Sequence, residues 1–282
     1  MRTLPSTAWL VLCSSIFLNA FFLNTVAQAD EIFPDPQLKA VIQSLLKQKQ
    51  INKPEIDPAD LKTIYFLDAQ GKQIKDLTGL EKCFHLAEVK LNNNQIVNLQ
   101  PLSTLVNIQS LSLSQNQISD LKPLAALVKL QYFEAEENKI SSLAGLEKME
   151  NMRAMYVAKN QIEDLSPLRQ MKKLNSLDLN ENQVVDLSPL QDLPWISTLG
   201  LKQNKVEDLS PLMKNTSLHY TFLEGNPLKT LAPLVEMAQK DAAGPKHFAP
   251  FWSLYLDVDK LPADAKPQVE ELKKSGVRIN PK

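Results

Sequence analysis

The chain has 282 residues, enough for one or two domains with a substantial core. Hydrophobic residues make up 44% and charged residues 22% of it, as in ordinary soluble globular proteins. The formal net charge of −1 gives no electrostatic reason to expect a nucleic acid or an anionic membrane as a partner.

The first 29 residues have the pattern of a secretory signal peptide. Arg2 is the only charged residue among them, residues 8–23 are mostly apolar, and Ala27-Gln28-Ala29 has the small residues of a cleavage site. An uncleaved membrane anchor is the alternative, but Asn19 interrupts the apolar run. We therefore expect residues 1–29 to be removed and the rest to be exported, to the periplasm, the cell surface or the medium, without stable membrane insertion.

Residues 30–60 are predicted to form an N-terminal helical cap. Asp35-Pro36 is a helix start signal. An apolar stripe at helical spacing follows it: Leu38, Val41, Ile42, Leu45 and Leu46. Asp57-Pro58 predicts a second, short helical turn that leads into Leu61.

Eight units of 22 residues follow, from residue 61 to residue 236, and the first of them is degenerate. Seven asparagines mark the units at a strict spacing of 22 residues: Asn94, Asn116, Asn138, Asn160, Asn182, Asn204 and Asn226. An alternating apolar pair, such as Leu111 and Leu113, precedes each asparagine, and a proline precedes a leucine further on in most units. One unit cannot bury enough apolar surface to fold alone, so the units must stack.

The parts of the repeat predict the parts of one coil. The apolar pair has a period of two, so each unit should contribute a short strand to a parallel sheet. The asparagine amide should bond backbone groups of its own turn and of the next coil, which makes a ladder of asparagines. An acidic residue should cap the following turn in four units, at Asp120, Asp164, Asp186 and Asp208. Too few residues remain for a helix there, so 3₁₀ turns are expected on the convex side.

The register breaks after residue 236, and residues 237–282 are predicted to form a C-terminal cap. Apolar residues at helical spacing predict a helix that Gly244-Pro245 ends: Leu231, Leu234, Val235 and Ala238. A strand at Leu254 to Leu256 and a helix near residues 263–275 follow. The spacing of 33 residues from Thr221 to Leu254 indicates an insertion of 11 residues in this coil. The fold class expected is therefore an α/β solenoid, a horseshoe with helical caps at both ends.

The repeats resemble the 22-residue class of leucine-rich repeat found in bacterial internalins. The segment Ile32-Phe33-Pro34-Asp35, the helix after it and the link from Ile74 to Leu80 resemble the internalin N-terminal cap. Internalins are surface or secreted proteins whose concave faces bind protein partners, and the resemblance implies the same mode of binding here. This sequence departs from internalins in having no immunoglobulin-like region or wall-sorting signal after residue 236, so the resemblance carries no expectation about host-cell adhesion.

The concave face of the sheet is therefore the expected binding surface. Acidic residues outnumber basic ones at its outward positions by five (Glu88, Glu134, Glu136, Asp178, Glu224) to two (Lys90, Lys202). Tyr132 and Tyr156 come from adjacent coils and should lie within about 5–7 Å of each other. The residues predicted to bind the partner are Tyr132, Glu134, Glu136, Tyr156, Asp178 and Lys202, and they favour a basic or mixed protein surface over a glycan.

Two other interpretations of the outward residues remain open. These side chains could simply solvate the sheet, with the aromatic rings packed on one another. Tyr220 and Phe222 flank Thr221, which stands where leucine is expected, and both are predicted to pack under the C-terminal cap.

No motif predicts an enzyme. His85, His219 and His247 have no metal-ligand spacing, and there is no nucleophile elbow, zinc-protease motif, P-loop or dinucleotide-binding turn. Cys83, the only cysteine after residue 29, occupies an inward repeat position and should be an inert, buried thiol without a disulfide partner. Asn215-Thr216-Ser217 matches a glycosylation sequon.

We expect a monomeric, exported binding protein without catalytic activity, metal, cofactor or nucleic-acid partner. The alternative is a structural or self-assembling scaffold of the cell envelope.

Overall fold

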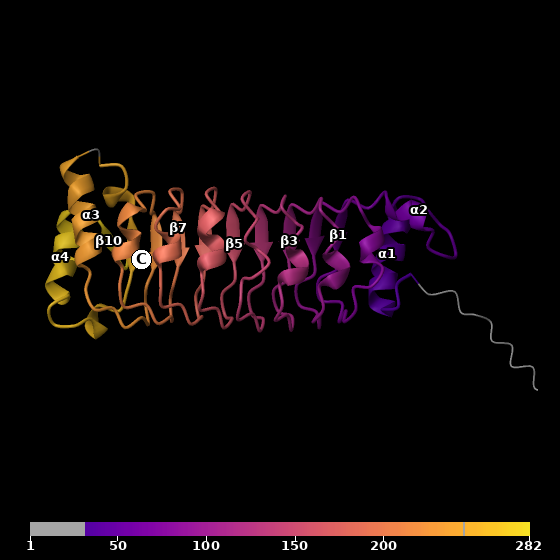
Figure 1. Ribbon diagram of the computed structural model, residues 1–282, viewed down its shortest axis with the longest axis horizontal. Helices are drawn as coiled ribbons and strands as arrows, with labels where there is room; N and C mark the ends of the chain where they lie inside the picture. Colours follow the sequence, from indigo (N-terminus) through magenta and orange to yellow (C-terminus); the bar gives the residue numbers. More distant parts are fainter. Residues whose placement is uncertain (1–31, 245) are drawn as a thin grey trace, which may run out of the picture. The chain divides into compact units, whose positions relative to one another are not determined.

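The computed structural model describes residues 32–244 and 246–282, so the predicted signal peptide at residues 1–29 lies outside the described residues. The described residues form successive coils that follow one another in chain order (Figure 1). No helix in residues 32–244 and 246–282 is both long and apolar enough to cross a membrane.

A single parallel sheet runs through all the coils. The predicted units supply eight of its strands: β1 (Phe66–Asp68), β2 (Glu88–Lys90), β3 (Ser110–Ser112), β4 (Tyr132–Glu134), β5 (Ala154–Tyr156), β6 (Ser176–Asp178), β7 (Thr198–Gly200) and β8 (Tyr220–Phe222). Two further strands, β9 (Ser253–Tyr255) and β10 (Arg278–Ile279), extend the sheet, whose order is β1 to β10. Residues 22 positions apart pair from β1 to β8, as in Ser110 with Tyr132. The solenoid predicted from the repeat is confirmed.

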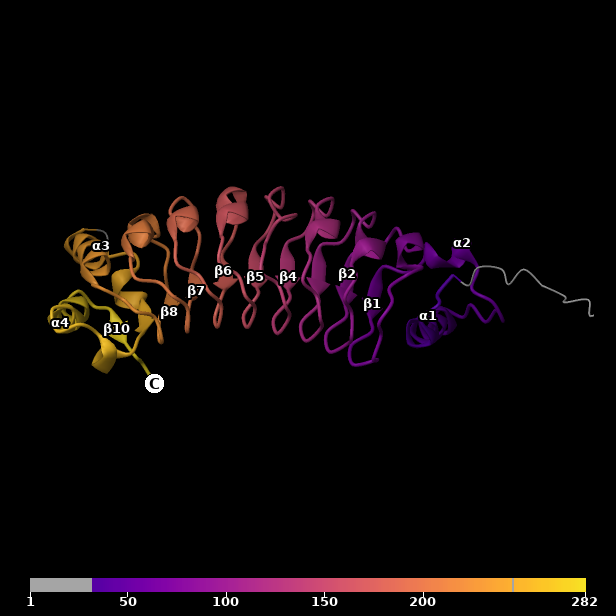
Figure 2. The same ribbon diagram turned by 60° about the horizontal axis from the view of Figure 1, so that its bottom comes forward.

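Short 3₁₀ turns lie on the side away from the strands in six of the coils (Figure 2). They are η1 (Leu80–Lys82), η2 (Gln100–Leu102), η3 (Lys122–Leu124), η4 (Ser166–Gln170), η5 (Ser188–Leu190) and η6 (Ser210–Lys214). The prediction is wrong for the coil that begins with β4, where Gly145 stands at the proline position with a φ of 105° and no 3₁₀ helix forms. Single turn bonds form there instead, such as those from Leu146 N to Leu143 O (3.1 Å) and from Met149 N to Leu146 O (3.0 Å). Glycine alone does not explain this, because Gly79 has a φ of 101° at the same position and η1 follows it.

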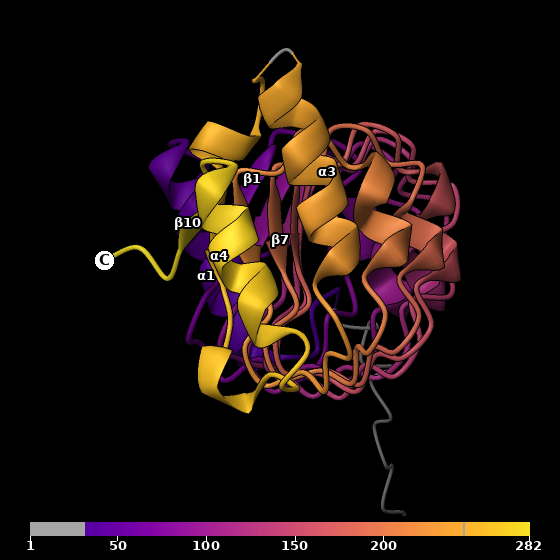
Figure 3. The same cartoon turned by 90° about the vertical axis from the view of Figure 1, so that its left-hand side faces the viewer.

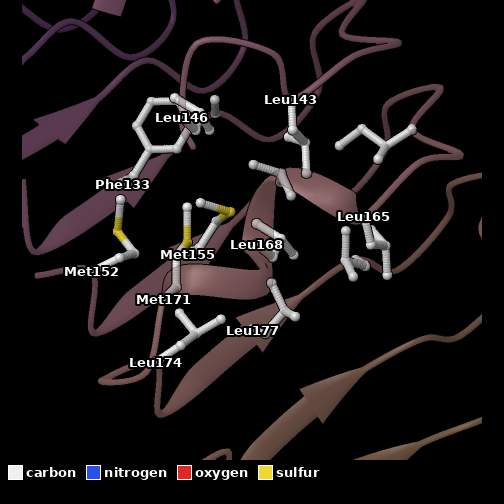
Figure 4. Packing of buried hydrophobic residues seen from close by; sticks show 14 of the residues in the cluster. Phe133, Leu143, Leu146, Met152, Met155, Leu165, Leu168, Met171, Leu174 and Leu177 are labelled. Carbon is white, nitrogen blue, oxygen red and sulfur yellow. The ribbon is translucent and has the colours of Figure 1, made fainter. Parts of the chain in front are cut away.

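The inward side chains form one continuous core from Phe33 to Val277. Figure 4 shows how Phe133, Met155 and Leu177 from three adjacent strands pack against residues of the outer turns. Methionines fill the middle of this stack, at Met149, Met152 and Met171, where their flexible side chains adapt to neighbours of different size. Cys83 is fully buried as predicted, and burial raises the pKa of its thiol to about 12.

The asparagines form a ladder of hydrogen bonds along the edge of the sheet. Asn116 Nδ2 donates to Leu113 O (2.9 Å) in its own turn and to Leu91 O (3.0 Å) in the preceding coil. Its Oδ1 accepts from Ile96 N (3.0 Å), also in the preceding coil. The sequence predicts partners in the next coil instead. The structure shows that this direction is wrong. Each asparagine lies over the turn of the preceding coil and bonds to backbone groups there.

The N-terminal cap is tied to the first coil by one carboxylate. Helices α1 (Pro36–Gln48) and α2 (Pro58–Leu61) begin at the two predicted Asp-Pro pairs. Asp35 Oδ1 accepts from Gln37 N (2.9 Å) and Leu38 N (3.0 Å) at the start of α1. Its Oδ2 accepts from Lys75 N (2.9 Å) and Asp76 N (3.2 Å) beyond β1. Burial alone would raise the pKa of Asp35, but these four donors outweigh it and lower the pKa.

The C-terminal cap closes the other end of the stack with two helices, α3 (Ala232–Ala243) and α4 (Lys266–Lys274), which Figure 3 shows over the last coils. Two short turns, η7 (Ala249–Phe251) and η8 (Val258–Lys260), complete the cap. The predicted 33-residue spacing is present, because Thr221 of β8 pairs with Leu254 of β9. Thr221 stands in place of leucine because its Oγ1 accepts from the buried Trp252 Nε1 at 2.9 Å.

Candidate protein-binding face

The outward side chains of β1 to β8, and those two residues after the last residue of each strand, form what we call the sheet face. Register places these side chains in rows that cross the strands. One row contains Phe66, Glu88, Ser110, Tyr132, Ala154, Ser176, Thr198 and Tyr220. The next contains Asp68, Lys90, Ser112, Glu134, Tyr156, Asp178, Gly200 and Phe222.

Tyr132 and Tyr156 lie together at the centre of the sheet face. Their ring centroids are 5.6 Å apart and the rings are tilted by 48°. Tyr132 Oη donates to Glu134 Oε2 over 3.4 Å, a long hydrogen bond. Burial and the neighbouring Glu134 carboxylate raise the pKa of Tyr132 to about 12, so the phenol stays neutral and keeps its proton. Aromatic rings that are held by a sheet and remain partly exposed are the side chains most enriched at binding hot spots.

Three carboxylates surround the tyrosine pair. Glu134 and Asp178 flank Tyr156 in the same row, on β4 and β6. Burial raises the pKa of Asp178, and one hydrogen bond from Asn180 N (2.9 Å) does not cancel that effect. Burial also raises the pKa of Glu136, and repulsion by Asp178 and Glu134 adds to it. The three carboxylates give this part of the sheet face a negative charge, and their mutual repulsion contributes to the raised pKa of Glu136.

Lys202, the sixth predicted residue, does not join this group. It follows β7, its N–H donates to Asn180 Oδ1 (2.8 Å), and its charge acts on Asp257 of the C-terminal cap. The structure thus brings together Tyr132, Glu134, Glu136, Tyr156 and Asp178, and places Lys202 at their C-terminal border.

Gly200 makes room for Asp178, a role that the sequence does not reveal. A Cβ at residue 200 would lie 2.6 Å from Asp178 Oδ1 and 3.0 Å from the Asn180 amide. The carboxylate therefore lies over the glycine backbone of the next strand. Repeat register could have suggested this, because Gly200 is the direct pairing partner of Asp178.

The first coil adds an aromatic residue and a hollow to the sheet face. Phe66 of β1 lies in the same row as Tyr132 and is 64% exposed. A shallow hollow of about 500 Å³ lies beside the carboxylates and is lined in part by Gln70, Asn92 and Ser114. The sequence prediction began at β2 and missed Phe66, because the first unit is degenerate.

Some outward positions are less open than their register predicts. Ser112, Ser114 and Ala158 are buried, and Ser114 Oγ accepts from Glu136 N at 3.0 Å. Phe222 stacks on Tyr255 of the C-terminal cap, with ring centroids 4.7 Å apart, as predicted. Tyr220 is 46% exposed, so the prediction that it packs under the cap is wrong.

His85 and the asparagine of the sequon, Asn215, are held by contacts within the fold. His85 stacks on Tyr65 (5.6 Å between centroids), and its Nδ1 lies 2.7 Å from Lys62 O. Asn215 is 1% exposed and its Nδ2 donates to two backbone carbonyls, so its amide is closed to glycosylation in the folded chain. In the described part of the chain, no three His, Cys, Asp or Glu side chains are placed to hold a metal ion.

Charge is divided between the two halves of the coils from residue 122 to residue 186. The strands and the turns after them (132–140, 154–164 and 176–186) hold eight acidic and two basic side chains, a net charge of −6. The outer turns and the return to the next strand (122–131, 144–153 and 166–175) hold seven basic and two acidic side chains, a net charge of +5. The chain's net charge of −1 conceals this separation.

The 22-residue coil, its asparagine ladder and its exposed sheet face define a leucine-rich-repeat protein. The family of Leucine Rich repeats (2 copies) matches residues 84–126, 106–148 and 150–192. Internalin C2 of Listeria monocytogenes is 30% identical, with a TM-score of 0.68 over 73% of this chain and 91% of that one. Internalin F of the same species is 27% identical, with a TM-score of 0.72 over 89% of this chain and 72% of that one. The chain belongs to the internalin-like family of bacterial leucine-rich-repeat proteins.

More distant structures share the fold alone. A leucine-rich-repeat protein of Leptospira interrogans is 19% identical, with a TM-score of 0.62 over 73% of this chain and 57% of that one. A search of curated proteins finds no match.

Proposed function

We propose that the chain is an exported protein that binds a protein partner with a basic surface through its sheet face. The observation that carries this proposal is the Tyr132–Tyr156 pair, set among Glu134, Glu136 and Asp178. Tyrosine supplies a rigid apolar surface, and the carboxylates attract lysine and arginine side chains. Lys202 at the border of the group would orient the partner by repelling its most basic part.

The raised pKa values of Glu136 and Asp178 support binding over simple solvation of the sheet. A carboxylate whose pKa is raised by folding destabilises the folded state at neutral pH. A sheet that only needed polar cover could carry serine or threonine at these positions, as β3 does at Ser110 and β7 does at Thr198. Carboxylates that oppose folding are instead typical of sites selected for binding.

The test is capture of partners by residues 30–282 from envelope and external fractions of the source organism. The variant to compare carries Tyr132→Ser, Glu134→Gln and Tyr156→Ser. A matched control carries Val97→Ser, Glu163→Gln and Val185→Ser, which change exposed residues in the turns beside the sheet. The proposal expects the control to retain a captured protein and the sheet-face variant to lose it. Equal capture by both variants, each with an unchanged circular dichroism spectrum, would refute it.

Two further measurements address the class of function. Sedimentation velocity over a wide concentration range separates a monomeric binding protein from a self-assembling scaffold, because only the scaffold sediments faster as concentration rises. Export is tested by the N-terminal sequence of the protein recovered outside the cytoplasm. Cleavage after Ala29 would leave Asp30 at the N-terminus, and retention of residues 1–29 would contradict the proposal.

A further inference from the structure

The edge of the stack between the outer turns and the strands carries a run of exposed basic residues. It consists of the residues that lead into successive strands, at 128–131, 150–153, 172–175 and 194–197. Four bases lie there, against one acid, Glu150: Lys129, Arg153, Lys172 and Lys173. All four are exposed. We call these four residues, together with Trp195, the basic edge.

Hydrogen bonds show that the coils along this edge are in contact. Lys129 Nζ donates to Asn107 Oδ1 (2.8 Å), and Lys173 Nζ donates to Asn151 Oδ1 (2.7 Å), each across one coil. Both acceptors are neutral amides, so neither hydrogen bond neutralises the charge of its lysine. Lys172 Nζ donates to the backbone carbonyl of Asp192 (3.2 Å), and its charge helps to lower the pKa of the Asp192 carboxylate, which Lys214 binds at 2.9 Å. Among the described residues, no ion pair within 4.0 Å joins a base of the basic edge to a carboxylate.

Large apolar side chains are exposed along the same edge. Trp195 is 61% exposed and follows Lys173 by one coil, and Asn175 Nδ2 donates to its carbonyl at 2.9 Å. Toward the N-terminal end, Phe84 (50%), Val106 (43%) and Val128 (41%) occupy one repeat position in three successive coils. Exposed tryptophan beside lysine and arginine is the combination found where proteins meet the interface of a bilayer.

We propose that the basic edge docks the exported protein on the surface of a membrane that contains anionic phospholipid. The four bases supply attraction to phosphate headgroups, which acts within a Debye length of about 8 Å at physiological salt. Trp195 enters the headgroup layer, and Val128, Val106 and Phe84, three to five coils toward the N-terminus, lie against the same layer. The acidic half of each coil carries the opposite charge, so the same field turns the sheet face away from the membrane. A nucleic acid would satisfy the bases but would leave Trp195 and the valines in water, so lipid is the occupant that the edge favours.

The protein contains its own probe for this contact. Residues 30–282 keep every core residue from Phe33 to Val277, and they contain two tryptophans, the exposed Trp195 and the fully buried Trp252. Fluorescence of this chain is measured as vesicles are added, either of phosphatidylcholine alone or of equal parts of phosphatidylcholine and phosphatidylglycerol. We expect a blue shift, from Trp195 leaving water, and co-flotation with the anionic vesicles only.

Variants in both directions sharpen the test. Each base near an anionic surface strengthens binding about fivefold, so Lys172→Gln with Lys173→Gln should weaken the partition coefficient by about 25-fold. Glu150→Gln should strengthen it by about fivefold, with an unchanged circular dichroism spectrum. The sheet-face variant with Tyr132→Ser, Glu134→Gln and Tyr156→Ser is the matched control and should bind vesicles like the wild type.

Three results would overturn the proposal. One is the absence of flotation with anionic vesicles at physiological salt. Another is flotation that the Lys172 and Lys173 substitutions leave unchanged. The third is binding to heparin or duplex DNA as tight as to anionic vesicles, with no blue shift from Trp195, which would make the edge a site for polyanions in general.

Discussion

Replacing Asn160 by alanine probes the ladder that holds the coils in register. Asn160 Nδ2 donates to the carbonyls of Ala135 (2.9 Å), Val157 (3.1 Å) and Ala158 (3.2 Å). Its Oδ1 accepts from Ile140 N at 2.9 Å, in the preceding coil. The four bonds join two adjacent turns in the middle of the stack.

The cost of the substitution follows from which of these partners has a second bond. Each of the three carbonyls keeps another donor, in the bonds from Asn138 Nδ2 to Ala135 O, from Asn182 Nδ2 to Val157 O, and from Glu137 N to Ala158 O. Ile140 N has no other hydrogen bond in the structure and is buried. One buried N–H without a partner lowers the free energy of unfolding by about 1–3 kcal/mol.

Urea denaturation followed by circular dichroism measures this change, with Asn151→Ala as the matched control. Asn151 Nδ2 donates to the carbonyl of Val128 (3.1 Å) and its Oδ1 accepts from Lys173 Nζ (2.7 Å), both at the exposed edge of the stack, where water can replace these bonds. The control should lower the free energy of unfolding by less than about 0.5 kcal/mol. The reasoning is refuted if Asn160→Ala destabilises the chain no more than Asn151→Ala does.

Three other substitutions test separate parts of the structure. Thr221→Val leaves the buried Trp252 N–H without its acceptor and should lower the free energy of unfolding by about 1–3 kcal/mol in the same assay, whereas Thr221→Ser should not. Folding lowers the pKa of Asp35, so the ionised carboxylate stabilises the folded state above its unfolded pKa, and this stabilisation is lost as pH falls through its folded pKa. The loss of unfolding free energy caused by Asp35→Asn should therefore become smaller in urea titrations below about pH 4. Asp178 has a raised pKa, so Asp178→Asn should raise the urea midpoint at neutral pH while weakening partner binding. A lower midpoint would contradict the origin given for that shift.

Most of the fold could be predicted from the sequence because the same structural pattern recurs in every repeat. The alternating apolar pair defines each strand, and a fixed spacing of 22 residues fixes the pairing of strands, as in Leu111 with Phe133. The asparagines were placed by the same spacing, although the direction of their bonds depends on how one turn lies over another. Local start signals at Asp35 and Asp57 were sufficient for the two N-terminal helices.

Features that depend on single long-range contacts could not be predicted. Strand β10 has two residues, too few for an alternating pattern to predict it, and it forms because α4 returns the chain to β9. Thr221 replaces the leucine of the repeat and accepts a hydrogen bond from Trp252, which lies in the cap 31 residues later. On the sheet face, the position of Tyr132 and Tyr156 in adjacent repeats predicted their contact. The space that Gly200 leaves for Asp178 could be recognised only from the side-chain positions in the structure.

Site-specific photo-crosslinking most directly tests whether the sheet face binds a protein partner. A benzophenone amino acid is introduced at Tyr156, at the centre of the sheet face, or at Val97, in a turn beside it. Both chains are then irradiated with the envelope and external fractions. The account predicts a crosslinked protein of defined mass from position 156 that is absent from position 97 and that high salt diminishes. A crosslink from position 97 alone, or none from position 156, would contradict it.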